Sequence, residues 1–487
     1  MQYHSTRGFS PAVDSAQAVL TGLAPDGGLY MPENLPAFDW KDCVQSDCLT
    51  MAAKILNAFL PDFPDMDKLV EKAYTGKFET PDLTPTVPAG DFYVLELFRG
   101  PTSAFKDVAL SMLPQLMTAA RGIKGMQEDI LILTATSGDT GKAALEGFRD
   151  VDGIRICVFY PHGGVSDVQR RQMVSQEGKN VTVCAVQGNF DDAQTGVKEI
   201  FAACRDKKLP FRLSSANSIN IGRLVPQITY YFKAYRDLLD AKRITMGQEA
   251  NFSVPTGNFG DILAGYLAKR LGLPVGRLVC ASNANNVLTD FIQTGIYDRR
   301  RQLYKTESPS MDILVSSNLE RLLYLMCEDS AQVAGWMSQL NTLGCYQVPQ
   351  DLLKTIQQQF WAGWCDDEKC ARTIQKVWKE NGYLCDTHTA SGWAVAEDYV
   401  NQTGDNRPMV VLSTASPYKF PAAVLQAIGG DASGDEFALM EHLEDVSGVK
   451  IPKNLANLRE KPERHLDVID KNEMLGFVLA LGEEKEK

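Results

Sequence analysis

One lysine stands out as a residue that could do chemistry. Lys106 lies in RGPTSAFKD, between a turn and a segment with helical apolar spacing. A lysine among small and apolar neighbours can have a lowered pKa, which makes its amine a nucleophile and a proton carrier. Its position alone is more typical of a solvated lysine at a helix start, so the case for chemistry at Lys106 depends on the other motifs in the chain.

Three loops that carry glycine or small polar residues follow apolar runs with the length of buried strands. They read SGDTG after residues 129–135, GNFGD after residues 251–255, and STASP after residues 409–412. Glycine lets the backbone approach a ligand closely, and free N–H groups at the start of a helix bind anions. In an open α/β sheet such loops meet at the carboxyl ends of the strands, where ligands bind.

These loops do not match the common nucleotide-binding motifs. In GDTGK, residues 138–142, the glycines are too close together for a P-loop, and Ala143 replaces the magnesium-binding hydroxyl. No strand is followed by GxGxxG with an acidic residue further on. An early lysine, a Gly-Asn-Phe-Gly loop and a late strand-end hydroxyl instead fit pyridoxal phosphate. That cofactor needs an imine partner, a phosphate site and a partner for its ring nitrogen.

The elements that must position these residues alternate in type. Apolar runs predict strands at 92–97, 129–135, 155–160, 180–186, 251–255, 277–281 and 409–412. Helices are expected at 51–60, 167–175, 194–204 and 421–427, and the region around Trp336, Phe360 and Trp364 is expected to be mostly helical. This alternation predicts parallel βαβ units. After Gly430 the chain is more charged and ends in GEEKEK, which predicts a solvated tail.

Composition narrows the class of protein. The 487 residues, 44% hydrophobic and 23% charged, are typical of a globular chain with several domains. A net charge of −12 argues against a nucleic-acid binder, and no apolar run is long enough for a membrane span. The start of the chain lacks the pattern of a signal peptide, and eleven scattered cysteines predict a reduced, cytoplasmic protein. The five histidines lie far apart, so no metal site is expected.

Six stretches, in the same order, resemble the threonine synthase family in its longer form. They are APDGGLY, FRGPTSAFKD, TATSGDTGKAA, SANSINIGRLVPQITYYF, VPTGNFGDILAGY, and DTHTASG with STASPYKFP. The resemblance implies the α/β fold of fold-type II pyridoxal-phosphate enzymes, which is similar to the tryptophan synthase β subunit, with two parallel-sheet domains and a small N-terminal domain. The expected limits are 1–88 for the N-terminal domain, 89–125 with 222–430 for the large cofactor-binding domain, 126–221 for the small substrate-binding domain, and 431–487 for a C-terminal extension.

The resemblance also implies roles for particular residues. Lys106 would hold pyridoxal 5'-phosphate as an imine and would be the catalytic amine. The cofactor phosphate would lie on Gly257, Asn258, Phe259, Gly260 and Asp261, and Thr414 would hydrogen-bond the pyridine nitrogen. The substrate carboxylate would be received by Ser137, Gly138, Asp139, Thr140 and Gly141. Two positions depart from the usual pattern: Thr387 replaces a frequent proline, and Ser416 replaces a frequent histidine.

Several polar residues are weaker candidates for the substrate site. An arginine flanked by amides and hydroxyls suits a phosphate, which makes Asn217, Ser218 and Arg223 candidates. A structural salt bridge is the alternative for Arg223. Lys142 either binds an anion or is a solvated lysine, and His388 either lines the cleft or is a structural histidine with satisfied hydrogen bonds.

The activity implied by the resemblance is conversion of O-phospho-L-homoserine and water to L-threonine and phosphate. It proceeds by γ-elimination followed by β-addition of water, in threonine biosynthesis. One alternative is a related phospholyase or dehydratase that gives 2-oxobutanoate, and another is a non-catalytic protein on the same scaffold. The expected partner is the small-molecule substrate, without nucleic acid or membrane, and the chain is expected to be a monomer or homodimer.

Overall fold

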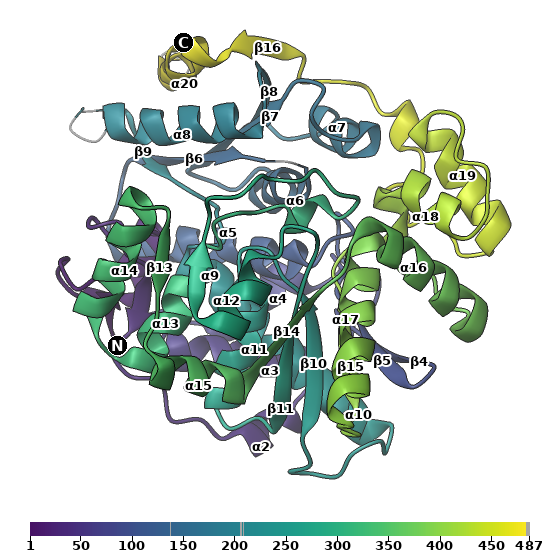
Figure 1. Cartoon of the computed structure of the whole chain (residues 1–487). Coiled ribbons are helices and arrows are strands. Elements are labelled where there is room, and N and C mark those ends of the chain that lie inside the picture. Colours follow the sequence, from purple (N-terminus) through teal and green to yellow (C-terminus); the bar gives the residue numbers. More distant parts are fainter. Residues whose placement is uncertain (137, 205–206, 208, 484–487) are drawn as a thin grey trace.

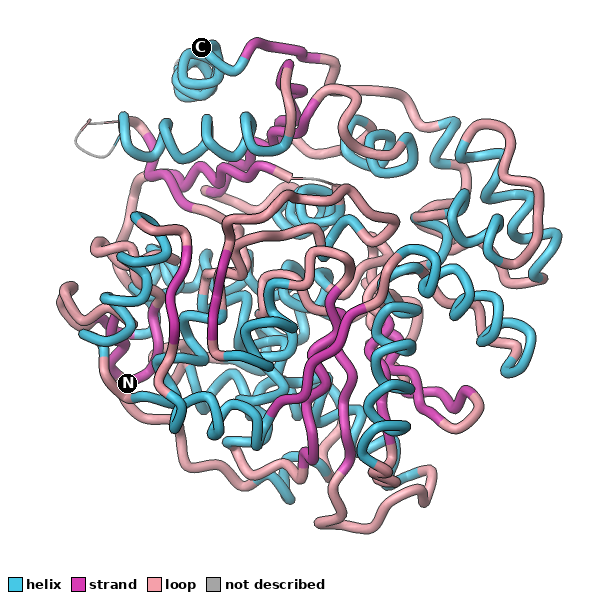
Figure 2. The backbone as a smooth tube through the Cα atoms, in the orientation of Figure 1, coloured by secondary structure: helices cyan, strands magenta, loops and turns pink. Residues whose placement is uncertain are grey.

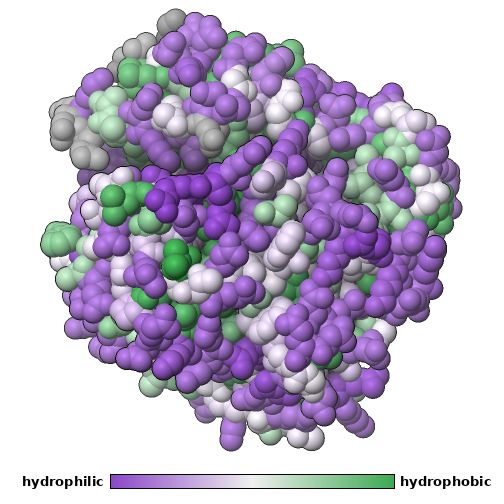
Figure 3. Space-filling view, in the orientation of Figure 1, coloured by the Kyte–Doolittle hydropathy of each residue, from purple (hydrophilic) through white to green (hydrophobic). Residues whose placement is uncertain are grey.

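The computed structural model describes residues 1–136, 138–204, 207 and 209–483. Two mainly parallel sheets dominate it, the smaller one in the upper part of Figure 1 and the larger one below it. Figure 2 shows loops filling the region between the small sheet and the nearer ends of the large-sheet strands. The face seen in Figure 3 is mostly hydrophilic, with hydrophobic side chains in small separate groups. Within the described ranges no helix combines the length and apolarity needed to cross a bilayer.

The large sheet has six strands, and five of them are parallel. Their order is β14 (Phe360–Trp364), β11 (Val275–Ser282), β10 (Ala250–Pro255), β15 (Met409–Ser413), β5 (Phe92–Glu96) and β4 (Thr86–Ala89). Only β4 runs antiparallel to its neighbour. Strand β10 reads ANFSVP and is buried at every position, as expected for a central parallel strand covered on both faces. Helices on this sheet include α10 (Ile228–Asp240), α11 (Gly260–Arg270), α12 (Val287–Thr294) and α17 (Thr387–Thr403), and α5 (Lys106–Ile123) follows β5 in the chain.

The small sheet is parallel throughout. Its order is β16 (Asp467–Asp470), β8 (Val181–Gln187), β7 (Ile154–Pro161), β6 (Asp129–Ala135) and β9 (Phe211–Ser214). The accompanying helices are α6 (Asp139–Phe148), α7 (Asp167–Val174), α8 (Phe190–Cys204) and α20 (Met474–Glu483). Both sheets therefore end their strands in loops that precede helices, the arrangement in which ligands bind at the carboxyl edge.

The first 74 residues pack onto the large-sheet unit. A three-stranded sheet, β2-β1-β3 (Val13–Asp14, Gln2–Ser5, Tyr30–Pro32), lies with α1 (Ser15–Thr21), α2 (Trp40–Val44), α3 (Cys48–Phe59) and α4 (Met66–Tyr74). Tyr3 and Phe59 belong to the same continuous hydrophobic core as Leu110 and Tyr231. The N-terminal segment thus shares a core with α5 and α10, while the domain limits given above stay a prediction.

The predicted fold class is confirmed, and the region around Trp336 is mostly helical as predicted, with α13 (Leu319–Cys327), α14 (Ser330–Thr342), α15 (Gln350–Gln359) and α16 (Asp367–Asn381). Within it, Phe360 and Trp364 are the two ends of strand β14, and β13 (Cys345–Gln347) is a second short strand. One local expectation is wrong. The segment after Gly430 is not a solvated tail throughout: it forms α19 (Glu436–Ser447), β16 and α20. Met474 and Val478 of α20 are at most 1% exposed, because they pack against α8 and the small sheet.

Candidate active site

Lys106 is the first residue of α5, and the segment that leads into it, residues 103–105, runs beside the end of β15. The N–H of Phe105 donates to the Thr414 carbonyl at 2.9 Å, and the N–H of Ser416 donates to the Ser103 carbonyl at 3.1 Å. These bonds bring Thr414, the predicted partner of a ring nitrogen, next to the lysine. Among the described residues the Thr414 hydroxyl has no hydrogen-bond partner, and the residue is 6% exposed.

The Lys106 amine is almost enclosed, at 11% exposure. Its Nζ lies 3.5 Å from Ser310 Oγ and 3.8 Å from Asp139 Oδ2. Burial lowers the pKa of this amine below its ordinary value; the Asp139 carboxylate opposes the shift, and the Lys419 and Arg223 cations add to it. The environment therefore favours a neutral amine more than water does, which is what a lysine needs to attack a carbonyl or to accept a proton.

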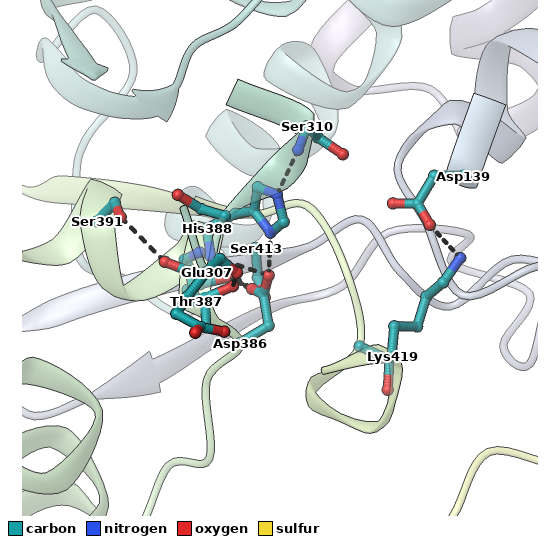
Figure 4. Close-up of polar contacts among 12 residues, drawn as sticks. Asp139, Glu307, Ser310, Asp386, Thr387, His388, Ser391, Ser413 and Lys419 are labelled. Carbon is teal, nitrogen blue, oxygen red and sulfur yellow. Dashed lines mark hydrogen bonds and ion pairs between the residues drawn. The ribbon is translucent and has the colours of Figure 1, made fainter. Parts of the chain in front are cut away.

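Asp139 bridges the two sheets at this point (Figure 4). It begins α6 on the small sheet, and its Oδ1 lies 2.5 Å from Nζ of Lys419, which follows β15 of the large sheet. Lys419 is fully buried and also donates to the Thr102 carbonyl at 3.2 Å. Burial alone would raise the pKa of Asp139, but the Lys419 and Lys106 cations lower it below its ordinary value. The carboxylate is thus held in its charged form between two lysines.

The GNFGD loop follows β10 and leads into α11. The Ser316 hydroxyl donates to the Gly257 carbonyl at 2.7 Å, and the Asn318 N–H donates to the Asn258 carbonyl at 3.0 Å. Because C=O and N–H of a trans peptide point in opposite directions, the N–H groups of Asn258 and Phe259 face away from residues 316–318. Phe259 has a left-handed φ of 62°, and no side chain caps the helix start. Free backbone donors at this turn suit an anion.

Ser310 connects this loop to the lysine. A Cβ on Gly257 would lie 2.6 Å from the Ser310 carbonyl oxygen, so only glycine fits there. The same serine places its hydroxyl 3.5 Å from Lys106 Nζ. The amine and the glycine loop, about 150 residues apart in the sequence, therefore border one site.

Asp261, the last residue of the predicted loop, is a buried carboxyl group. Tyr230 donates to its Oδ1 at 2.6 Å and Tyr231 at 3.0 Å, whereas Oδ2 is buried without a partner among the described residues. Burial raises the pKa of Asp261 to about 6, although the two tyrosines act in the opposite direction. A carboxyl of this kind can hold its proton in mildly acidic solution.

Arg223 is a buried guanidinium with no ion-pair partner among the described residues. It is 2% exposed, and its Nη1 donates to the Ala216 carbonyl at 2.8 Å while Nε has no partner. The salt bridge that was the alternative for Arg223 is therefore not formed. Burial lowers its pKa to about 10. Asn217 and Ser218 lie half-buried just before it, and the Ser218 carbonyl accepts from Asn318 at 3.3 Å.

The loop after β6 is partly described. Thr136 Oγ1 accepts from the N–H groups of Gly138 at 3.0 Å and Gly141 at 2.9 Å. Thr140 is half-buried, and Ser137 lies outside the described residues. Lys142 is 13% exposed and is paired with Glu146 at 3.1 Å and with Gln176. The solvated lysine is therefore wrong for Lys142, and none of its contacts joins it to Lys106.

Three residues at the site were not singled out by the sequence. Ser310 lies in a segment without a motif, Gln169 donates to Asp139 Oδ1 at 3.1 Å, and Lys419 lies in SPYKF just after a predicted loop. The sequence signals for Lys419 are its position beyond a strand end and its place in the STASPYKFP stretch, where no role was assigned to it. His388 is 1% exposed with both ring nitrogens hydrogen-bonded, so the interpretation as a satisfied histidine holds.

Comparisons with known proteins agree along the whole chain. Residues 2–74 match the family model "Threonine synthase N terminus", residues 75–335 "Pyridoxal-phosphate dependent enzyme", and residues 389–475 "Threonine synthase, C-terminal". The threonine synthase of Pseudomonas aeruginosa is 41% identical, with 92% of this chain and 93% of that protein covered. Threonine synthase-like 1 of Macaca fascicularis is 39% identical over 85% of this chain, which spans 58% of that protein's length.

Solved structures give the same result. The crystal structure of PLP-bound threonine synthase from Brucella melitensis has a TM-score of 0.88 and 37% identity, covering 99% of this chain and 100% of that one. Yeast threonine synthase has a TM-score of 0.88 and 33% identity, covering 100% and 99%. Identity above 30% over nearly full length, with three matching family models, leads to one assignment: the chain belongs to the threonine synthase family of pyridoxal-phosphate dependent enzymes.

Proposed function

We propose that this chain converts O-phospho-L-homoserine and water to L-threonine and phosphate. The observation that carries the proposal is the placement of Ser310 between the Lys106 amine and Gly257. A nucleophilic amine and a glycine turn with free N–H groups border one site. The buried guanidinium of Arg223, which has no ion-pair partner among the described residues, interacts electrostatically with the amine. Such a site suits an amino-acid substrate that carries a phosphate.

The residues present fit pyridoxal phosphate. Lys106 would form the covalent link to it, and the N–H groups of the turn from Gly257 to Asp261 would hold its phosphate, since these donors have no side-chain cap. The free hydroxyl of Thr414 would bond its ring nitrogen. When bound, the cofactor accepts the electron pair released from the Cα–H bond of the substrate. A neutral hydroxyl partner leaves the ring nitrogen unprotonated and so moderates this electron withdrawal.

Proton transfer falls to the Lys106 amine. Burial lowers its pKa, so a larger fraction is neutral and able to take the α-proton of the substrate at Nζ. Once Nζ has passed that proton on, the same amine can take a β-proton. Loss of the γ-phosphate needs positive charge, which we assign to Arg223 because its buried Nε has no other partner among the described residues. The two abstracted protons return to Cγ and Cα, the hydroxyl of water adds at Cβ, and the remaining proton of water goes to the released phosphate. Phosphate and threonine account for all atoms of substrate and water.

The other predicted contacts belong to the same proposal. The turn from Gly138 to Gly141 would receive the substrate carboxylate, and Asn217 and Ser218 would contact the substrate phosphate beside Arg223. Lys142 is a weaker candidate, because Glu146 and Gln176 already occupy its ammonium group. The cytoplasmic location and the monomeric or dimeric state stay predictions from the sequence.

The test is a spectrum of the purified protein before and after borohydride, followed by peptide mapping and an assay of both products. We expect the label on Lys106 and equal amounts of phosphate and threonine. Lys106→Ala should lose the visible band and turnover, and an intact band in that variant would refute the assignment. Release of 2-oxobutanoate with phosphate would favour the phospholyase alternative.

A further inference from the structure

Ser310 is fixed by a histidine that makes no contact with the lysine itself. His388 Nε2 accepts the N–H of Ser310 at 3.1 Å, and its Nδ1 lies 2.7 Å from Asp386 Oδ2 (Figure 4). A neutral imidazole has one accepting and one donating nitrogen, so the bond from Ser310 requires the proton on Nδ1, where it is donated to Asp386. The contacts therefore define one tautomer.

The Asp386–His388 pair is held rigidly at the start of α17. Asp386 is the N-cap of this helix and accepts the N–H groups of His388 and Thr389, each at 3.0 Å. Asp386 is fully buried and His388 is 1% exposed, so neither side chain has space to turn. The imidazole thus presents its accepting nitrogen in a fixed direction.

The loop that carries Ser310 is anchored on both sides of the serine. Asp312 Oδ1 accepts from Asn283 at 2.8 Å and from the Thr306 hydroxyl at 2.8 Å. The Thr387 hydroxyl donates to the Glu307 carbonyl at 2.7 Å. At the serine itself, the bond to His388 fixes the backbone N–H of the residue whose carbonyl lies against Gly257 and whose hydroxyl lies near Lys106.

We propose that His388 is a positioning residue for the Lys106 amine, that it acts through Ser310, and that Asp386 sets its tautomer. The proposal rests on the proposed function, in which this amine moves the protons. An amine that donates one N–H to Ser310 Oγ has its lone pair directed away from that bond. The serine therefore restricts the direction from which Lys106 attacks an aldehyde or takes a proton.

Four variants test this in the full-length chain: His388→Leu, His388→Gln, Ser310→Ala and, as a matched control, Ser391→Ala. Ser391 is buried in the same helix and donates to the Thr387 carbonyl at 3.0 Å, with no contact to Ser310. The first readout is the rate at which the visible band forms when pyridoxal phosphate is added to cofactor-stripped protein, a reaction that releases water. The second is kcat and KM for threonine release.

We expect His388→Leu and Ser310→Ala each to slow band formation and kcat about tenfold, the effect of one misplaced hydrogen bond. KM should change less than kcat. Glutamine can accept from Ser310 and donate to Asp386, so His388→Gln should recover to within about threefold. The double variant His388→Leu with Ser310→Ala should be no slower than Ser310→Ala alone, because His388 acts only through the Ser310 hydroxyl that Ser310→Ala already removes. The control should match the wild type.

Wild-type rates for both His388→Leu and Ser310→Ala would overturn the proposal, as would additive losses in the double variant. If His388→Leu does not fold, the rates of Ser310→Ala and of His388→Gln still test the proposal: wild-type rates in Ser310→Ala would overturn it. If the wild-type protein forms the band but releases no threonine, the proposed function fails, while the band-formation rates still test His388.

Discussion

Removing the Asp139 carboxylate should destabilise the protein strongly. Asp139 and Lys419 are 3% and 0% exposed, their charged atoms are 2.5 Å apart, and Lys106 lies 3.8 Å from the other oxygen. Asp139→Asn leaves two buried ammonium groups without a carboxylate. Breaking a buried pair from one side costs about 3 to 5 kcal/mol, because the remaining charge stays desolvated. The free energy of unfolding from urea titration, at matched m values, measures this loss.

The order of the related variants follows from the same contacts. Lys419→Met should cost less than Asp139→Asn, because the carboxylate keeps Lys106 and Gln169 as partners. The double variant should be more stable than Asp139→Asn, since it also removes the buried Lys419 ammonium, which Asp139→Asn leaves without a carboxylate. Lys376→Met breaks the half-exposed pair with Glu397 and serves as a control, with a cost below about 1 kcal/mol.

The pH dependence of the wild type has a definite sign. The two cations hold the pKa of Asp139 below its ordinary value of 3.8. The stabilisation is therefore complete above that value and is lost as the pH falls further below it. The reasoning would be refuted by an Asp139→Asn protein within about 1 kcal/mol of the wild type at neutral pH, or by a double variant that is the least stable of the set.

Three further outcomes are expected. Gly257→Ala places a Cβ 2.6 Å from the Ser310 carbonyl oxygen and should weaken pyridoxal phosphate binding at least about tenfold in a fluorescence titration. Gly335→Ala adds a Cβ in open space and should leave the affinity unchanged. Equal affinities of the two variants would contradict the tight turn at Gly257. Burial raises the pKa of Asp261 to about 6, so between about pH 4 and 6 the folded protein keeps this proton while the unfolded chain loses it. The free energy of unfolding should therefore fall as the pH rises over that range. Asp261→Asn should flatten this pH dependence in urea titrations, and an unchanged pH dependence would contradict the role of Asp261. Val478→Asp buries a charge between α20 and the small sheet and should lower the free energy of unfolding by about 3 kcal/mol or more, measured by thermal unfolding. A wild-type midpoint would show that the packing of α20 adds little to stability.

Local sequence signals were sufficient to predict the residue limits of helices and strands that have clear boundaries. The run DILILTA and the helix from Pro421 to Ala427 have the predicted limits, because turn residues flank an unambiguous apolar pattern. Strand β14 has no such boundary. Phe360 is the C-cap of α15, so helix and strand join without a loop, and the strand forms because it pairs with β11, with Leu278 opposite Phe360. That pairing is a long-range contact that aromatic composition does not encode.

The residues of the candidate site also fall into two groups: some are indicated by local sequence motifs, and others are recognised only from contacts between distant segments. Lys106, the glycine turn and Thr414 stand in motifs, so their neighbours in the sequence were sufficient to indicate them. Ser310 lies outside every motif, and Lys419 lies in the STASPYKFP stretch without a role that the sequence indicated. They become important only because the 306–312 loop and the segment after β15 fold against α5 and α6. A contact made by one side chain from each of two distant segments leaves no periodic pattern to read.

Strand β16 has a consequence for synthesis of the chain. It hydrogen-bonds to β8, with Asp467 opposite Cys184, and covers an edge that is otherwise the end of the small sheet. A nascent chain therefore exposes the unpaired rim of β8 until the segment at 467–470 leaves the ribosome. An unpaired edge strand can pair with strands of other molecules and so promote aggregation. Completion of this sheet is a late event in biogenesis, and shielding of β8 by chaperones during translation would protect the yield of active enzyme.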